Sequence, residues 1–149
     1  MENIWTKIND HVELYFEDIV KTYGMKAVKI DPLSTALIKN NLALIISIDR
    51  FEVDVYYVYR NEKNDLKILS CGSFFAEKYA DDDREKLIPI NQAGDLIKNY
   101  LTVIAHGLKS KWNTMLEGDR TWMIEYEKSN WYTEEELKPE EEKILSQYI

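Results

Sequence analysis

The sequence is poor in the residues that build disulfide frameworks, phosphate-binding loops and flexible linkers. Among its 149 residues there are one cysteine, five glycines and three prolines. The lone Cys71 excludes an internal disulfide and a cysteine-rich zinc site. Five scattered glycines form neither a Walker loop nor a Rossmann fingerprint, so we expect no nucleotide cofactor. The length is that of one globular domain, which we expect to span residues 1–149.

Histidine is almost as scarce, and the two that occur are His11 and His106. A zinc-binding pair on one helix needs two histidines about four residues apart, which this chain lacks. No serine lies in a Gly-x-Ser-x-Gly elbow, and no base lies near Cys71 in sequence, so we expect Cys71 to be a small buried apolar residue. We therefore predict no catalytic, metal-binding or cofactor-binding residues, and a protein that is not an enzyme.

Long apolar runs are also missing. The most apolar stretch, Leu42 to Ile48, has seven residues, whereas a membrane-spanning helix needs about 20. Residues 1–7 do not combine a basic region with an apolar stretch, so we expect no secretion signal. Lysine outnumbers arginine 15 to 4, a bias common in AT-rich bacterial genomes. We expect a cytoplasmic bacterial protein that does not bind membranes, and its single unpaired cysteine fits a reducing compartment.

Negative charge is what the chain has in excess. Its 27 acidic and 19 basic residues give a formal charge of −8, which argues against a nucleic-acid partner. The charge is uneven, because residues 117–149 hold ten acids and four bases, whereas residues 1–116 hold 17 acids and 15 bases. We therefore expect residues 133–149 to form an acidic C-terminal helical appendage.

Hydrophobic periodicity predicts an α+β fold. Residues 4–23 repeat apolar side chains every three or four positions, and Gly24 follows as a helix C-cap. Residues 92–116 repeat in the same way, with Asn91 as the expected N-cap and Gly118 as the stop. Between the two helices, β-rich runs in direct succession indicate an antiparallel meander of four to five strands. These runs are residues 25–30, 35–39, 42–49, 51–60 and 66–71. We expect the long helix to pack across one face of this sheet.

Local patterns add detail at the turns, helix ends and faces. Asn40-Asn41 suits a tight hairpin, because asparagine tolerates positive φ. Thr133 and Glu136 have the spacing of a capping box, and Pro139 suits the first turn of a final helix. The apolar stripe expected on helix 92–116 consists of Ala93, Leu96, Ile97, Tyr100, Ile104, Leu108, Trp112 and Met115.

Strand 51–60 supplies the first candidate site residues. Its alternation places Phe51, Val53, Val55, Tyr57 and Tyr59 on one face and Glu52, Asp54, Tyr56, Val58 and Arg60 on the other. Tyr56 is then either covered by a helix or part of an acidic recognition surface, where tyrosine offers contact area at little entropic cost. The candidate partner-binding residues are the acids and aromatics Asp49, Glu52, Asp54, Tyr56, Trp131, Tyr132, Glu134, Glu135 and Glu136.

These features favour a small acidic binding protein. The most concrete form is an inhibitor or immunity protein that neutralises a basic toxin or nuclease, because an acidic surface steers a basic partner. One alternative is a self-associating structural or regulatory module of a bacterial or phage genome, with the C-terminal aromatics in a homodimer contact. A second is a metal-dependent nuclease, since Asp49, Glu52 and Asp54 followed by Asp65-Leu66-Lys67 resemble the loose acid and Asp-x-Lys pattern of restriction-endonuclease-like enzymes.

Overall fold

The computed structural model describes residues 4–149 and has the predicted α+β architecture. The helices are α1 (Ile4–Asp10), α2 (Val12–Tyr15), α3 (Glu17–Tyr23), α4 (Gly72–Ala76), α5 (Asp95–Lys111), α6 (Asn113–Leu116), α7 (Trp122–Lys128) and α8 (Pro139–Leu145), with a 3-10 helix η1 (Asp81–Arg84). The strands are β1 (Lys26–Asp31), β2 (Ser34–Lys39), β3 (Leu42–Ile48), β4 (Val53–Arg60), β5 (Leu66–Ser70) and β6 (Glu134–Glu135). Among residues 4–149, no helix has both the length and the apolar character needed to cross a membrane.

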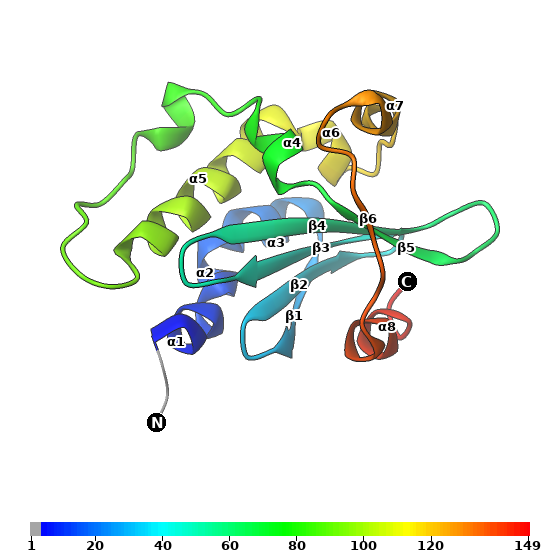
Figure 1. Cartoon of the computed structure of the whole chain (residues 1–149), viewed down its shortest axis with the longest axis horizontal. Helices are drawn as coiled ribbons and strands as arrows, with labels where there is room; N and C mark the ends of the chain where they lie inside the picture. Colours follow the sequence, from blue (N-terminus) through cyan, green and yellow to red (C-terminus); the bar gives the residue numbers. More distant parts are fainter. Residues whose placement is uncertain (1–3) are drawn as a thin grey trace.

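The six strands form one antiparallel sheet in chain order, β1 to β6 (Figure 1). Asn40-Asn41 joins β2 to β3 as predicted, with Lys39 opposite Leu42. Neither asparagine has a positive φ, so that part of the expectation is wrong. In residues 4–149 the one non-glycine residue with a positive φ is Asn64 (65°), in the turn between β4 and β5.

The first face of the sheet carries the larger core. Val12, Phe16 and Ile19 from the N-terminal helices pack there together with Leu101 and Leu108 of α5. Aromatic rings extend this core toward α7. They are Tyr57, Phe74, Phe75, Trp112, Trp122 and Tyr126. The Trp112 Nε1–H donates to the carbonyl of Phe75 at 3.0 Å, which ties α4 to the end of α5.

The N-terminal helix is broken rather than continuous, which corrects the prediction for residues 4–23. His11 (φ −110°, ψ 7°) separates α1 from α2, and Phe16 (φ −105°, ψ 12°) separates α2 from α3. At the first break the His11 N–H donates to the Ile8 carbonyl three residues back (3.0 Å), which tightens the helix locally. Phe16, which the predicted apolar stripe does not include, lies four residues after Val12 and three before Ile19 and is fully buried in the core. The helix still ends at Gly24, whose φ of 64° is the predicted left-handed cap.

The second face of the sheet is covered by α8. Ala36, Ile38, Ala43, Ile45, Val58 and Ile68 form a second core there with the fully buried Leu145 of α8. Figure 1 shows α8 on the opposite side of the sheet from α5. The acidic C-terminal segment is thus a structural layer of the fold. Tyr56 is half-buried against this core, so it lies at the border between the interior and the open part of the face.

The start of α8 differs from the expected capping box. Thr133 and Glu136 do not form one, because the Ser70 N–H donates to the Thr133 carbonyl (3.1 Å) as this segment joins the sheet beside β5. The helix begins at Pro139, as predicted, and a carboxylate oxygen of Glu141 accepts the Lys138 N–H at 2.8 Å.

The start of α5 is also displaced from the prediction. Asn91 is not the N-cap; that position is held by Gly94, whose φ is 95°. Asp95 Oδ2 instead accepts the N–H groups of Asn91 (2.9 Å) and Gln92 (3.0 Å) and draws the preceding loop onto the helix. The predicted continuous helix is interrupted at Trp112 (φ −126°, ψ 26°), which separates α5 from α6. Gly118 (φ 108°) then follows α6 and is the predicted stop.

Replacing Leu145 with alanine tests the role of α8. The variant Leu145→Ala should lower the free energy of unfolding by about 2–5 kcal/mol, since it leaves a cavity in the second core. Urea denaturation followed by circular dichroism measures the change. Ile124→Ala on α7 is the control, because Ile124 is 60% exposed and should change stability little. Equal stabilities of the two variants would show that α8 does not contribute to the core.

Candidate functional site

An exposed apolar groove lies between the start of β4, helix α4, the loop of residues 85–94 and helix α5. Its volume is about 520 Å³. Of its lining residues, the large apolar ones that remain exposed are Phe51, Leu87, Ile90, Leu96 and Tyr100. Phe51 is 78% exposed and Ile90 is 61% exposed. Exposed apolar side chains that gather around one concave surface are typical of an interaction site. We call this surface the apolar groove.

Two side chains of α5 fix the loop that forms one wall of the apolar groove. The buried Asn99 accepts the Ile88 N–H through Oδ1 and donates to the Ile88 carbonyl through Nδ2, each at 2.9 Å. Asp95 holds the loop further along by the two backbone bonds described above. The loop is therefore held in place even though its apolar side chains face outward. Because the loop is already ordered, binding a partner there costs less conformational entropy.

The inner end of the apolar groove contains Tyr79. Its ring packs closely against Gly107 of α5, where a Cβ atom would lie 2.3 Å from the ring. The Tyr79 hydroxyl is buried and has no hydrogen-bond partner within residues 4–149. Burial and the nearby Asp83 raise the pKa of Tyr79, so the hydroxyl stays protonated at neutral pH. It is thus a free donor beside the groove.

One rim of the apolar groove is acidic. Glu52 and Asp54 line it, and Asp49 and Glu135 are close enough to act on Asp54 electrostatically. Partial burial and these three carboxylates raise the pKa of Asp54. Burial together with the neighbouring carboxylates raises the pKa of Tyr56 to about 12. In the described part of the chain none of these four carboxylates forms an ion pair, so their mutual repulsion is uncompensated.

The structure divides the nine candidate residues between two places. Asp49, Glu52, Asp54, Tyr56 and Glu135 gather at the acidic rim. The other four lie along the segment from residue 131 to residue 136, and they are Trp131, Tyr132, Glu134 and Glu136.

The alternation of β6 separates Glu135 from Glu134. Glu134 lies opposite Leu69 and Glu135 opposite Ile68, so the two glutamates point to opposite faces of the sheet. The Tyr132 hydroxyl donates to Glu134 at 3.1 Å on the side of α7, away from the rim.

The acid and Asp-x-Lys pattern of the nuclease alternative does not converge on one site. Lys67 is paired with Tyr59 in the sheet, five positions along β4 from Asp54, a separation of about 17 Å. The two side chains also lie on opposite faces, since Asp54 and Tyr59 differ by an odd number of positions. Lys67 instead makes an ion pair with Glu134 at 3.6 Å. In residues 4–149 no group of three or more histidine, cysteine or acidic side chains is arranged to hold a metal ion.

Cys71 is fully buried in the first core, as expected for a small apolar side chain. Burial raises the pKa of its thiol to about 12, and hydrogen bonds with Tyr126 and with the Tyr57 backbone offset this only in part. The thiolate needed for nucleophilic chemistry is therefore nearly absent at neutral pH.

His106 belongs to a polar cluster around the buried Asp83. Asp83 Oδ1 accepts from His106 Nδ1 and Ser110 Oγ, both at 2.6 Å, and Oδ2 accepts the Ala80 N–H at 2.9 Å. Lys111 Nζ lies 3.2 Å from Oδ2. Because these bonds join η1 to α5, and because His106 does not line the apolar groove, the cluster is a clamp between two elements of the fold.

Sequence reasoning missed the apolar part of the site. Phe51 is predicted to share a strand face with Tyr57 and Tyr59, but β4 begins only at Val53 and leaves Phe51 exposed before it. Ala93, Leu96 and Tyr100 were expected on the buried stripe of the long helix; Ala93 precedes α5, and the other two face outward. The sequence does indicate that some apolar residues of this helix are exposed, because residues 95–111 carry more apolar positions than one buried face of a helix accommodates.

Comparison of the chain with protein-family models, with curated proteins and with solved structures found no match.

The Asp83 clamp gives a pH-dependent prediction. Burial alone would raise the pKa of Asp83, but the bonds from Ser110, Ala80, His106 and Lys111 together hold it well below its usual range. The contribution of Asp83 to the free energy of unfolding is then fully present above the pKa of this carboxyl group in the unfolded chain, which is about 4. It is lost as the pH falls below that value. Asp83→Asn should therefore lower the free energy of unfolding at pH 7 by about 1–3 kcal/mol and flatten its decline below pH 4.

Urea titrations of Asp83→Asn at pH 7, 5, 4 and 3 measure this dependence. The matched control is Asp81→Asn, an exposed neighbour in the same 3-10 helix. If both variants show the same pH profile as the parent protein, the clamp contributes nothing to stability.

Proposed function

We propose that this protein is a small inhibitor or immunity protein that binds a basic protein, such as a toxin or nuclease, through the apolar groove and its acidic rim. The observation that carries the proposal is the pairing of exposed apolar side chains with uncompensated carboxylates on one surface. Protein interfaces combine these two properties, with apolar anchors at the centre and charge at the border.

The acidic rim favours a cationic partner. Carboxylates that repel one another weaken the folded state, so a cluster without ion pairs is best explained by a partner that brings the missing positive charge. Glu52 is exposed at this rim and can meet a lysine or arginine without rearrangement of the fold. A basic nuclease has such residues, because it must itself attract the phosphates of its substrate.

The apolar groove supplies the affinity. Phe51, at 78% exposure, and Ile90, at 61%, would each bury a large area against a partner. The loop that carries Ile90 is already held by Asn99 and Asp95, so little order has to be gained on binding. The cytoplasm of a bacterium remains the proposed location.

The test begins with capture from a lysate of the native organism at low salt on the immobilised protein. The proposal requires a basic protein that binds in a 1:1 complex and loses its toxic or nucleolytic activity when this protein is added. Failure to retain any such protein, or retention of nucleic acid in its place, would contradict it.

Two substitutions in the site then separate charge from apolar contact. Glu52→Lys should slow association with the captured partner by about tenfold and reduce its salt dependence, because it reverses the charge at the rim. Phe51→Ser should mainly speed dissociation, because it removes an apolar anchor. Surface plasmon resonance measures both rates.

Matched substitutions elsewhere on the surface are the controls. Glu62→Lys reverses an exposed charge in the turn between β4 and β5, and Ile124→Ser removes a 60% exposed apolar side chain on α7. Both should bind as the parent protein does. If Glu52→Lys and Glu62→Lys have the same effect, net charge alone governs binding and the rim is not the interface.

A further inference from the structure

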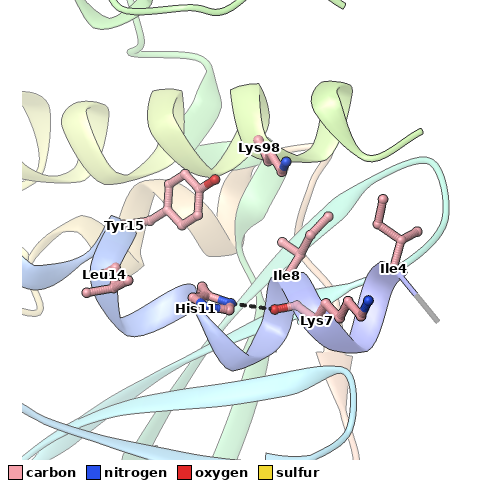
Figure 2. Close-up of a pocket in the computed structure, with 7 residues that line it drawn as sticks. All are labelled: Ile4, Lys7, Ile8, His11, Leu14, Tyr15 and Lys98. Carbon is pink, nitrogen blue, oxygen red and sulfur yellow. Dashed lines mark hydrogen bonds between the residues drawn. The ribbon is translucent and has the colours of Figure 1, made fainter. Parts of the chain in front are cut away.

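A second groove lies on another part of the molecule, between helices α1 and α2 and the first turns of α5. It encloses about 530 Å³ and is lined by Ile4, Lys7, Ile8, His11, Leu14, Tyr15 and Lys98. Figure 2 shows Lys98 reaching down from α5 on one side, with Lys7 and His11 on the other side. We call this surface the cationic groove.

The charge of its lining is the reverse of the charge of the whole protein. The formal charge of the chain is −8, with 27 acidic residues against 19 basic ones. Yet among residues 4–149 the groove is lined by the bases Lys7, His11 and Lys98 and by no acidic side chain. Lys98 Nζ lies 3.9 Å from Oδ1 of the buried Asp95, an ion pair too long for a hydrogen bond. The N–H donors of the Lys98 ammonium group therefore remain able to bind a second anion.

The remaining lining is apolar. Ile4 and Ile8 form the end of the groove next to the start of α5, where their Cδ1 atoms approach within 3.0 Å of the position a Cβ would take on Gly94. Leu14 is 64% exposed at the opposite end of the groove, two positions along the chain from the buried Val12. These three residues give the groove an aliphatic lining.

Tyr15 and His11 supply polar atoms beside this apolar surface. In Figure 2 the hydroxyl of Tyr15 points from α2 toward α5. Burial and the charge of Asp95 raise the pKa of Tyr15, so it remains a donor at neutral pH. His11 Nδ1 lies 2.8 Å from the Lys7 carbonyl, which can only accept, so Nδ1 carries the proton and Nε2 is left for another partner.

We propose that the cationic groove binds a small free carboxylate with an unbranched apolar chain, with the carboxylate held between Lys7 and Lys98 and the chain against Ile8 and Leu14. Positive charge on opposite walls selects an anion, and the aliphatic lining selects a chain. The volume lies in the range of small-molecule sites. This site is separate from the apolar groove and does not depend on the proposed function.

Octanoate is the probe for this proposal, used with the complete chain in isothermal titration calorimetry. Saturable binding of one octanoate per protein is expected, with clearly weaker binding of octan-1-ol and none of octylammonium. Backbone NMR shifts should change at residues 7, 14, 15 and 98. No saturable binding of octanoate, or equal binding of octan-1-ol, overturns the proposal.

Variants assign the binding to this groove. The double variant Lys7→Gln/Lys98→Gln should weaken octanoate binding by about three- to tenfold, the effect of removing two exposed charges. The matched control Lys63→Gln/Lys143→Gln removes the same charge from exposed positions elsewhere and should bind normally. Leu14→Ser should weaken octanoate and octan-1-ol alike. Equal binding by the two double variants overturns the proposal, and circular dichroism verifies that each variant is folded.

Discussion

The neighbouring strands β2 and β3 are buried on both faces, and the rest of the fold depends on this constraint. Nearly every side chain from Ser34 to Ile48, outside the turn, is buried. Antiparallel sheets often leave one face to water, but these apolar strands cannot. The chain must therefore supply a layer on each side. The N-terminal helices and α5 cover the first face, and α8 covers the second.

The two layers cover the sheet to different extents, and this difference explains where the candidate site lies. α8 has only seven residues and packs toward β1, which leaves the end of the second face near Asp54 and Tyr56 partly open. On the first side α5 is held at both ends, and the loop before it carries apolar side chains outward. The acidic rim lies where these two incompletely covered regions meet.

The sequence predicted the fold class because its signals are local and repeated. Alternation in residues 51–60 and the turn at Asn40-Asn41 are set by neighbouring residues and so can be recognised directly. The breaks at His11 and Phe16 could not be predicted, because they follow from how the helix fits onto the sheet. The same applies to Thr133, where pairing with β5 replaced a helix cap.

For the candidate site, the sequence predicted the acidic residues but not the apolar residues that lie beside them. The acids Glu52 and Asp54 were selected from strand alternation and do line the apolar groove. Phe51 and Tyr100 also line that groove. The sequence pattern placed them on an apolar strand face and an apolar helix stripe, because whether such residues are exposed depends on tertiary packing. Glu134 and Glu135 are neighbours in sequence, yet strand geometry sends them to opposite faces.

The contact between α8 and β1 also sets the order in which the protein can be completed during synthesis. More than 100 residues separate Ile30 from Leu145, so the second core closes across almost the whole length of the chain. Ribosomes extend the chain from the N-terminus, at roughly 5–20 residues per second. The strands β1 to β5 are therefore made well before the helix that covers their second face. During that interval Ile38 and Ile45 have no helix to cover them, and exposed apolar surface of this kind makes an incomplete chain prone to aggregation.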